Sequence, residues 1–224
     1  MKKLIPFFVL LVFLALSACK NQTNAPQEAV SSEDALETSR TTTSIANIYE
    51  VDAANSVINW KATKVGGAHN GTLKLFSGRL AVDAGEMVAG EVVMDMSSIG
   101  VSDLTGDDKT KLENHLKSAD FFDAENYATA EFRFIQVQPL KDSEGINYSV
   151  SGNLRIKTAE KPVTVPAIVT IAEDKITVTT PTFTINRNDW GINYRSGLLG
   201  TVKDKIINDE IELSINLVAL PRKG

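Results

Sequence analysis

The chain has 224 residues, with 23 Lys and Arg against 28 Asp and Glu, and a formal net charge of −5 at pH 7. An acidic chain argues against nucleic-acid binding, which requires clustered cations, and against electrostatic adhesion to anionic lipid surfaces. A single cysteine and two histidines argue against a disulfide framework and against a structural zinc site.

The N-terminal segment has the layout of a secretory signal peptide. Two lysines precede an almost uninterrupted apolar run over residues 4–16, and the small residues Ser17 and Ala18 follow it. The run is shorter than the roughly 20 residues that a membrane-spanning helix needs. We therefore predict that residues 1–18 are a signal peptide.

Cys19, the only cysteine, ends this segment. The sequence Leu16-Ser17-Ala18-Cys19 resembles the lipobox of bacterial lipoproteins, which implies acylation of Cys19 as the first mature residue and anchoring in the membrane. Lys20 follows, where an aspartate would resemble an inner-membrane retention signal. We therefore expect an outer-membrane anchor that faces the periplasm.

Residues 19–46 are rich in Asn, Gln, Thr, Ser, Glu and Ala and have almost no large apolar side chains. Such a segment cannot bury enough surface to offset its ordering entropy. It is predicted to be the lipidated N-terminus and a flexible tether, and residues 47–220 are predicted to form the folded domain. Without the two leader lysines, 21 Lys and Arg face 28 Asp and Glu, a net charge of −7.

From Ile48 onward, apolar residues recur at every second position, which is typical of half-buried antiparallel strands. The clearest series are Ile58-Trp60-Ala62, Val88-Gly90-Val92-Met94-Met96, Tyr148-Val150-Gly152-Leu154-Ile156, Val163-Val165-Ala167-Val169-Ile171 and Ile211-Leu213-Ile215-Leu217. The alternation predicts about eight long strands.

Two breaks in the alternation and one polar segment complete the pattern. The phase changes around Gly78 and at Thr180-Pro181, which predicts bulges or bends that curl a sheet into a barrel. Residues 105–118 are polar, with two leucines at helical spacing. We predict an all-β antiparallel barrel with one short helical insertion, which either covers one end of the barrel or forms a surface excursion.

A closed barrel of about eight strands holds either its own side chains or one small ligand. The inward-facing set here consists of Val, Ile, Leu, Met, Phe and Trp, so the contents of a hollow interior must be apolar. The alternation does not distinguish a hollow barrel from a filled one.

The order of several motifs resembles the YceI-like family of secreted bacterial proteins, described as polyisoprenoid-binding. The motifs are Trp60, Gly66-Gly67-Ala68-His69-Asn70-Gly71-Thr72, Phe76-Ser77-Gly78, Met94-Asp95-Met96-Ser97-Ser98-Ile99, Leu112-Glu113-Asn114-His115-Leu116-Lys117-Ser118-Ala119-Asp120-Phe121-Phe122-Asp123, Tyr127-Ala128-Thr129-Ala130-Glu131-Phe132, Gly152-Asn153-Leu154, Arg187-Asn188-Asp189-Trp190-Gly191 and Asp209-Glu210-Ile211. The resemblance implies a lipocalin-like barrel around a long apolar cavity that holds an isoprenoid chain. Ala128 stands where the family commonly has proline, and the lipobox replaces an ordinary cleavable signal.

The candidate ligand-binding residues are mostly large apolar side chains. They are Trp60, His69, Phe76, Val92, Met94, Phe121, Phe122, Phe132, Phe134, Val150, Leu154, Phe183, Arg187, Trp190 and Leu213. Each has an ordinary alternative: the two tryptophans as core anchors, Phe121 and Phe122 as packing for the helix, His69 as a loop cap. Arg187 is expected either to face a ligand headgroup or to form an ion pair with Asp189. His115 is expected to face solvent.

Together with the apolar inward face, the resemblance implies binding of a polyprenol or quinone-like molecule, for storage, transport or protection in the bacterial envelope. Hydrolase, zinc-protease and phosphate-loop motifs are absent from the sequence. The alternatives are an enzyme acting on a lipid or quinone headgroup near His69 and Arg187, and a filled barrel with a structural or stress-related role. No cofactor or metal is expected apart from a bound isoprenoid or quinone, and a homodimer is a candidate assembly.

Overall fold

The computed structural model of the protein describes residues 46–143 and 145–222. The predicted signal peptide, the lipidation site Cys19 and most of the predicted tether lie outside the described residues. Residues Ser44–Gly224 form one compact unit. In the described part of the chain, no helix is both long enough and apolar enough to cross a bilayer.

The described elements are ten strands, one α-helix and four short 3₁₀ turns. In chain order they are β1 (Asn47–Val51), η1 (Ala53–Asn55), β2 (Val57–Lys64), β3 (Gly67–Asp83), β4 (Glu86–Val101), α1 (Gly106–Lys117), β5 (Thr129–Ser143), β6 (Ile146–Ile156), β7 (Ala159–Ile171), β8 (Ile176–Thr179), β9 (Phe183–Asn186), η2 (Arg187–Trp190), η3 (Gly197–Leu199), η4 (Lys203–Lys205) and β10 (Ile207–Pro221).

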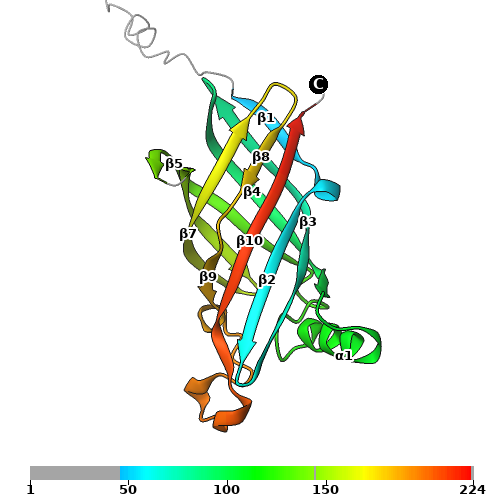
Figure 1. Cartoon of the computed structure of the whole chain (residues 1–224). Coiled ribbons are helices and arrows are strands. Elements are labelled where there is room, and N and C mark those ends of the chain that lie inside the picture. The colour runs from blue at the N-terminus through cyan, green and yellow to red at the C-terminus, as the bar shows by residue number, and fades with distance from the viewer. Residues whose placement is uncertain (1–45, 144, 223–224) are drawn as a thin grey trace, which may run out of the picture. The chain divides into compact units, whose positions relative to one another are not determined.

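The strands form one antiparallel sheet that closes on itself (Figure 1). Strands β2 to β8 follow in chain order, and β10 pairs with both β2 and β8 to complete the ring. β1 and β2 together occupy one position between β3 and β10, and β8 and β9 together occupy another beside β10. The ring therefore has eight positions, and the predicted all-β antiparallel barrel is confirmed.

The predicted alternation places most inward-facing residues correctly. Val92, Met94 and Met96 on β4 are buried, as are the five predicted inward residues of β6. Val88 is an exception, because Met87 is buried and Val88 is exposed. Ala81 of β3 pairs with Ala89, but the next residue, Val82, pairs with Met87, so Val88 is an extra residue on β4. This register shift changes which side chain of β4 points inward.

The predicted irregularity near Gly78 is a bulge at Phe76. Leu75 pairs with Met94 and Ser77 pairs with Val93, so Phe76 is the extra residue on β3. Its side chain is 66% exposed on the outer wall, and this position differs from the predicted one on the inner wall. The predicted break at Thr180-Pro181 lies between the end of β8 and the start of β9.

The two ends of the barrel are built differently (Figure 1). The upper end in this view carries the β3–β4 hairpin and the β7–β8 turn, and the lower end carries α1, the β2–β3 hairpin and the connection from β9 to β10. None of the residues of α1 is buried, and the helix packs mainly on β4. The turn after α1, at Phe121, is buried instead. The helix itself thus lies outside the barrel while the turn that follows it closes the lower end.

Candidate ligand-binding interior

The barrel is hollow along much of its length. An upper and a lower cavity, with volumes of about 100 and about 130 Å³, lie inside it. Four residues line both cavities: Ile58, Met94, Leu154 and Leu213. They come from β2, β4, β6 and β10, so strands on different sides of the ring border the place where the two cavities meet. We call these four residues the waist.

The upper cavity is lined by aliphatic and aromatic side chains. Phe132 and Phe134 of β5 lie 5.3 Å apart, centroid to centroid, and both face this space. Leu80 and Met87 border it near the β3–β4 hairpin, where both side chains are almost fully buried. Close packing at this hairpin limits the cavity on the upper side.

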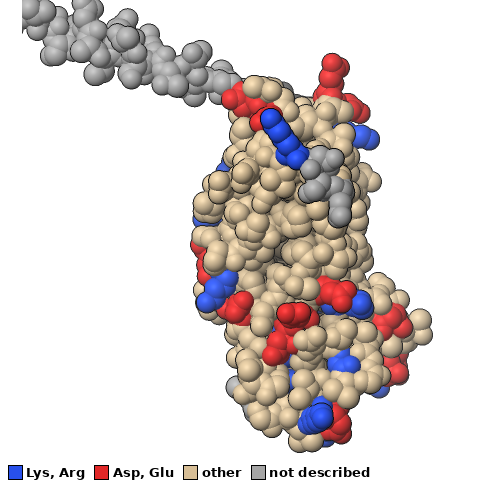
Figure 2. Space-filling view, turned by 60° about the vertical axis from the view of Figure 1, so that its left-hand side comes forward, with Lys and Arg blue, Asp and Glu red and all other residues tan. Residues whose placement is uncertain are grey.

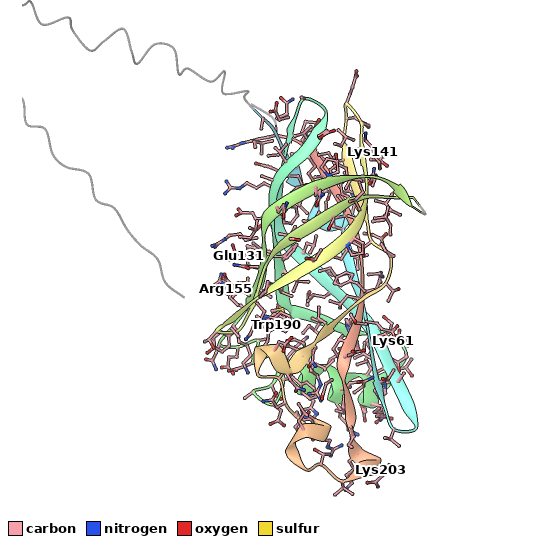
Figure 3. All side chains as sticks on the ribbon, turned by 90° about the vertical axis from the view of Figure 1, so that its left-hand side faces the viewer. Lys61, Glu131, Lys141, Arg155, Trp190 and Lys203 are labelled. Carbon is pink, nitrogen blue, oxygen red and sulfur yellow. The ribbon has the colours of Figure 1, made fainter. Side chains whose placement is uncertain are left out.

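The lower cavity lies between the barrel wall and the two segments that cross its end. Phe121 and Phe122 come from the turn after α1, and Trp190 and Ile192 come from the connection after β9. The Trp190 indole lies near the lower end of the barrel (Figure 3), where its Nε1–H donates to the Leu154 carbonyl at 2.9 Å. This bond uses the polar group of the side chain and leaves an apolar surface toward the cavity.

An aromatic cluster joins the two closing segments. The His115 ring lies 5.0 Å from Phe121 and 4.7 Å from Tyr194, edge to face in both cases. Its Nε2 lies 3.0 Å from an Asp120 carboxylate oxygen. His115 was expected to face solvent, but it is half-buried because its ring packs between side chains of both segments.

Arg187 is the one charged residue on the cavity wall among the described residues. The side chain is only 3% exposed, and its guanidinium donates to the carbonyls of Ile192 and Ile207 at 2.7 and 3.1 Å. It also donates to the Asn208 carbonyl and forms a 2.9 Å ion pair with Asp209. An ion pair was one of the two expected roles, but its partner is Asp209 rather than Asp189.

Burial lowers the pKa of the Arg187 guanidinium from its ordinary value, and the ion pair with Asp209 opposes that shift. The group is held by four acceptors that belong to the β9–β10 connection and to β10. Arg187 therefore fixes this connection to the barrel, and its donors are directed mainly at protein acceptors rather than into the cavity.

Thirteen of the fifteen candidate ligand-binding residues line one or both cavities. Those residues are Trp60, Val92, Met94, Phe121, Phe122, Phe132, Phe134, Val150, Leu154, Phe183, Arg187, Trp190 and Leu213. His69 and Phe76 line neither. His69 Nδ1 lies 2.8 Å from Asp103 on the outside of the barrel, because β3 turns its side chain toward the segment that follows β4.

Sequence reasoning missed other cavity residues. Ile58, Met96 and Ile156 share the inward phase of residues that were named, so the alternation itself could have added them. Ile192 and Ile207 belong to an irregular connection and to the start of a strand, where no periodic signal points inward. Only the folded connection brings these two side chains to the cavity.

The interior offers little polar chemistry. Among the described cavity-lining residues, the polar side chains are those of Arg187 and Thr180. In the described part of the chain, no group of three His, Cys, Asp or Glu residues is placed to hold a metal ion. The arrangement is suited to an apolar molecule held by contact area rather than by directed hydrogen bonds.

Comparisons with known proteins agree with this geometry. The YceI-like domain model matches residues 49–219. A UPF0312 protein of Vibrio cholerae is 25% identical over 157 residues, covering 70% of this chain and 72% of the relative. A UPF0312 protein of Azotobacter vinelandii is 25% identical over 160 residues, covering 71% of this chain and 72% of the relative.

Two solved structures have a similar fold. The crystal structure of Burkholderia cenocepacia BcnA matches with a TM-score of 0.60 and 25% identity, covering 75% of this chain and 98% of that one. A polyisoprenoid binding domain from Saccharophagus degradans, implicated in plant cell wall breakdown, matches with a TM-score of 0.54 and 14% identity, covering 78% and 98%. At that identity the second likeness shows the fold alone.

Proposed function

Because this chain belongs to the YceI-like family, we propose that it binds one long apolar molecule of the polyprenol or quinone class inside its barrel. The observation that carries the proposal is the pair of cavities that share a waist and are lined almost entirely by apolar side chains. The solved polyisoprenoid binding domain of similar fold supports the choice of ligand class.

The joined cavities have the shape that a chain molecule requires. Met87 and Ile99 of β4 border the upper and the lower cavity respectively. The twelve residue steps between them, at about 3.4 Å each on a strand tilted by about 40°, correspond to roughly 30 Å along the barrel axis. A flexible hydrocarbon chain fits such a space better than a compact ligand does.

Burial of hydrocarbon supplies the binding free energy. Each 100 Å² of ligand surface removed from water contributes about 2.5 kcal/mol, before the loss of translational and conformational freedom is subtracted. Met94 and Met96 add unbranched, adaptable side chains to the wall. With few polar groups in the interior, selection rests on length and flexibility, and chains with different headgroups are expected to bind.

The cellular role follows from the predicted anchor. We propose that acylated Cys19 holds the protein at the outer membrane on the periplasmic side, and that residues 19–46 allow the barrel to move within reach of it. A tethered barrel can store, protect or pass on an apolar molecule that would otherwise stay in the bilayer.

Organic extraction of the protein purified from its native membrane, followed by mass spectrometry, tests the ligand class. We expect a polyprenyl or quinone-like molecule in the extract, and purified protein stripped of lipid should take up a fluorescent polyprenyl probe. Extracts without such a molecule, together with no uptake of polyprenols or quinones, would contradict the proposal.

A substitution at the waist tests the location. Leu154→Trp places a large ring between the two cavities and should lower probe uptake at least about tenfold. Ile135→Trp is the matched control, because Ile135 is 71% exposed on the outer wall of β5. Equal uptake by the two folded variants would place the ligand elsewhere.

The two alternatives predict different results. A headgroup-modifying enzyme would show turnover that His69→Ala abolishes while probe binding persists, although His69 lines neither cavity. A filled barrel would bind no probe at all, and the two cavities argue against it.

A further inference from the structure

Three apolar side chains are exposed together at the lower end of the barrel. Val65 in the β2–β3 turn is 55% exposed, and Leu198 and Val202 in the β9–β10 connection are 77% and 66% exposed. With the lysines Lys64, Lys203 and Lys205 beside them in sequence, they form what we call the tip. Figure 3 shows Lys203 at the lowest point of the barrel, opposite in height to Lys141.

Hydrogen bonds hold the two halves of the tip next to each other. The Val65 amide donates to the Ile206 carbonyl at 3.2 Å, and the Ile207 amide donates to the Arg195 carbonyl at 3.0 Å. The fully buried Ser196 hydroxyl accepts from the Leu198 amide at 3.2 Å and donates to Asp209 at 2.9 Å. The apolar side chains are therefore presented on an ordered backbone.

The tip is basic although the chain is acidic. Lys64, Lys203 and Lys205 form no ion pair with any described residue, and Asp204 is the acidic residue between the last two. The formal net charge of the whole chain is −5. Figure 2 shows carboxylates beside lysines and arginines over the lower half of one face, down to its lowest part.

The same segment joins the tip to the lower cavity. Ile192 and Ile207 line that cavity, and Leu198 and Val202 lie between them in the chain. The guanidinium of Arg187 binds the carbonyls of Ile192 and Ile207. Whatever contacts the tip thus contacts the connection that closes the cavity.

We propose that the tip docks on a bilayer surface that contains anionic lipids, with its three apolar side chains in the interface and its lysines at the headgroups. Isolated apolar side chains beside unpaired lysines on a projecting loop match the chemistry of interfacial membrane binding. A stable protein partner would require a larger continuous surface than three side chains provide. The inference goes beyond the proposed ligand and holds whichever apolar molecule the barrel binds.

Cosedimentation of residues 44–224 with lipid vesicles tests the proposal. This unit contains the whole closed barrel and its core, and the matching BcnA chain consists almost entirely of the corresponding region. We expect binding to vesicles of phosphatidylethanolamine with phosphatidylglycerol, and weaker binding to phosphatidylcholine alone. Absence of binding to the anionic vesicles would overturn the proposal, even if the tip were found to bind a protein instead.

Two pairs of variants locate the contact. Leu198→Ser/Val202→Ser should weaken vesicle binding by about tenfold or more. Phe76→Ser/Ile135→Ser is the control, since both side chains are at least as exposed as Val202 but lie on the barrel wall. Lys203→Gln/Lys205→Gln should weaken vesicle binding about fivefold per lysine, and only at low salt. Lys141→Gln/Lys175→Gln at the other end of the barrel is the control and should not weaken it.

Equal losses in the tip variants and the wall variants would contradict a tip contact. A fluorescent label provides a second measurement that does not depend on affinity. Cys19 is the only cysteine in the chain, so Val202→Cys in residues 44–224 carries one label. Its emission should shift to the blue with anionic vesicles, while a label at Ile135→Cys should not shift. Because these assays use no isoprenoid, their failure would leave the proposed ligand binding intact.

Discussion

Gly71 and Trp60 show how single residues fix the wall of the lower cavity. They pair across β3 and β2, and the Trp60 Nε1–H donates to the Gly100 carbonyl at 3.2 Å. A Cβ atom at position 71 would lie 1.8 Å from the Gly100 oxygen and 2.7 Å from the Trp60 ring. Only glycine allows this approach of two backbones under the indole, so Gly71 of the Gly-rich motif serves packing.

Gly71→Ala is therefore expected to lower the free energy of unfolding by about 2–3 kcal/mol, because the backbone of β4 or the Trp60 ring must move. Urea denaturation followed by tryptophan fluorescence measures the change. Gly67→Ala is the control, since its nearest neighbour would be a flexible Lys64 carbon at 3.5 Å. Similar stabilities of the two variants would refute the packing role of Gly71.

At the scale of elements, ion pairs on the outer wall connect adjacent strands. Glu131 of β5 accepts from Arg155 of β6 and from Arg133 of its own strand, and the labels in Figure 3 show Glu131 beside Arg155. The hydrogen bond from Arg155 is the main reason that the pKa of Glu131 lies below its ordinary value, and Arg133 lowers it further. The charged carboxylate is therefore the form that stabilises the β5–β6 pair.

This shift fixes the direction of a pH effect. A lowered pKa in the folded state contributes stability above the unfolded value of about 4.5, and that contribution is lost as pH falls through the folded value. Glu131→Gln should lower the free energy of unfolding by about 1 kcal/mol at pH 7, and the difference from the parent should vanish in acid.

Denaturation curves at pH 7 and below pH 4 provide the comparison. Glu212→Gln, whose carboxylate pairs with a half-exposed Lys61, should change stability less at neutral pH. A Glu131→Gln difference of constant size at all pH values would show that the carboxylate charge is not what holds the pair.

At this scale the sequence predicted much of the fold. The inward residues of β6, β7 and β10 follow directly from period two, and the predicted helix over 105–118 is observed at Gly106–Lys117. Phe76 and Val88 were placed wrongly because each is the extra residue at a register shift, Phe76 on β3 and Val88 on β4. Each shift reverses the local phase, and its exact position depends on the partner strand. The sequence also left open whether α1 covers one end of the barrel or forms a surface excursion. In the structure, the turn at Phe121 that follows α1 closes the lower end.

For the whole molecule, the structure adds a closed ring and a tip to the predicted anchor. The ring forms when β10, at the end of the domain, pairs with both β2 and β8. The lower cavity and the tip share one connection, so a membrane contact at the tip would lie close to the segment that closes the interior. Cys19 would set how long the barrel stays near that membrane.

Cys19→Ser in the full chain tests the anchor. Loss of the acyl chains removes about 0.8 kcal/mol per buried methylene, so the protein should move from the membrane fraction to the soluble fraction. Fractionation and mass measurement of the mature N-terminus give the result. Retention of unacylated protein in the membrane would contradict the lipobox interpretation, and recovery of the parent with the inner membrane would contradict the predicted outer-membrane location.

The sequence by itself determined the antiparallel barrel, most of its inward side chains and the apolar character of its interior. These properties depend on the local geometry of a strand, where neighbouring side chains point to opposite faces. Only the tertiary structure decided that the barrel is hollow, that Arg187 binds Asp209, and that Val65 lies beside the β9–β10 connection. These properties depend on how side chains from distant segments pack together, and a local sequence pattern does not contain that information.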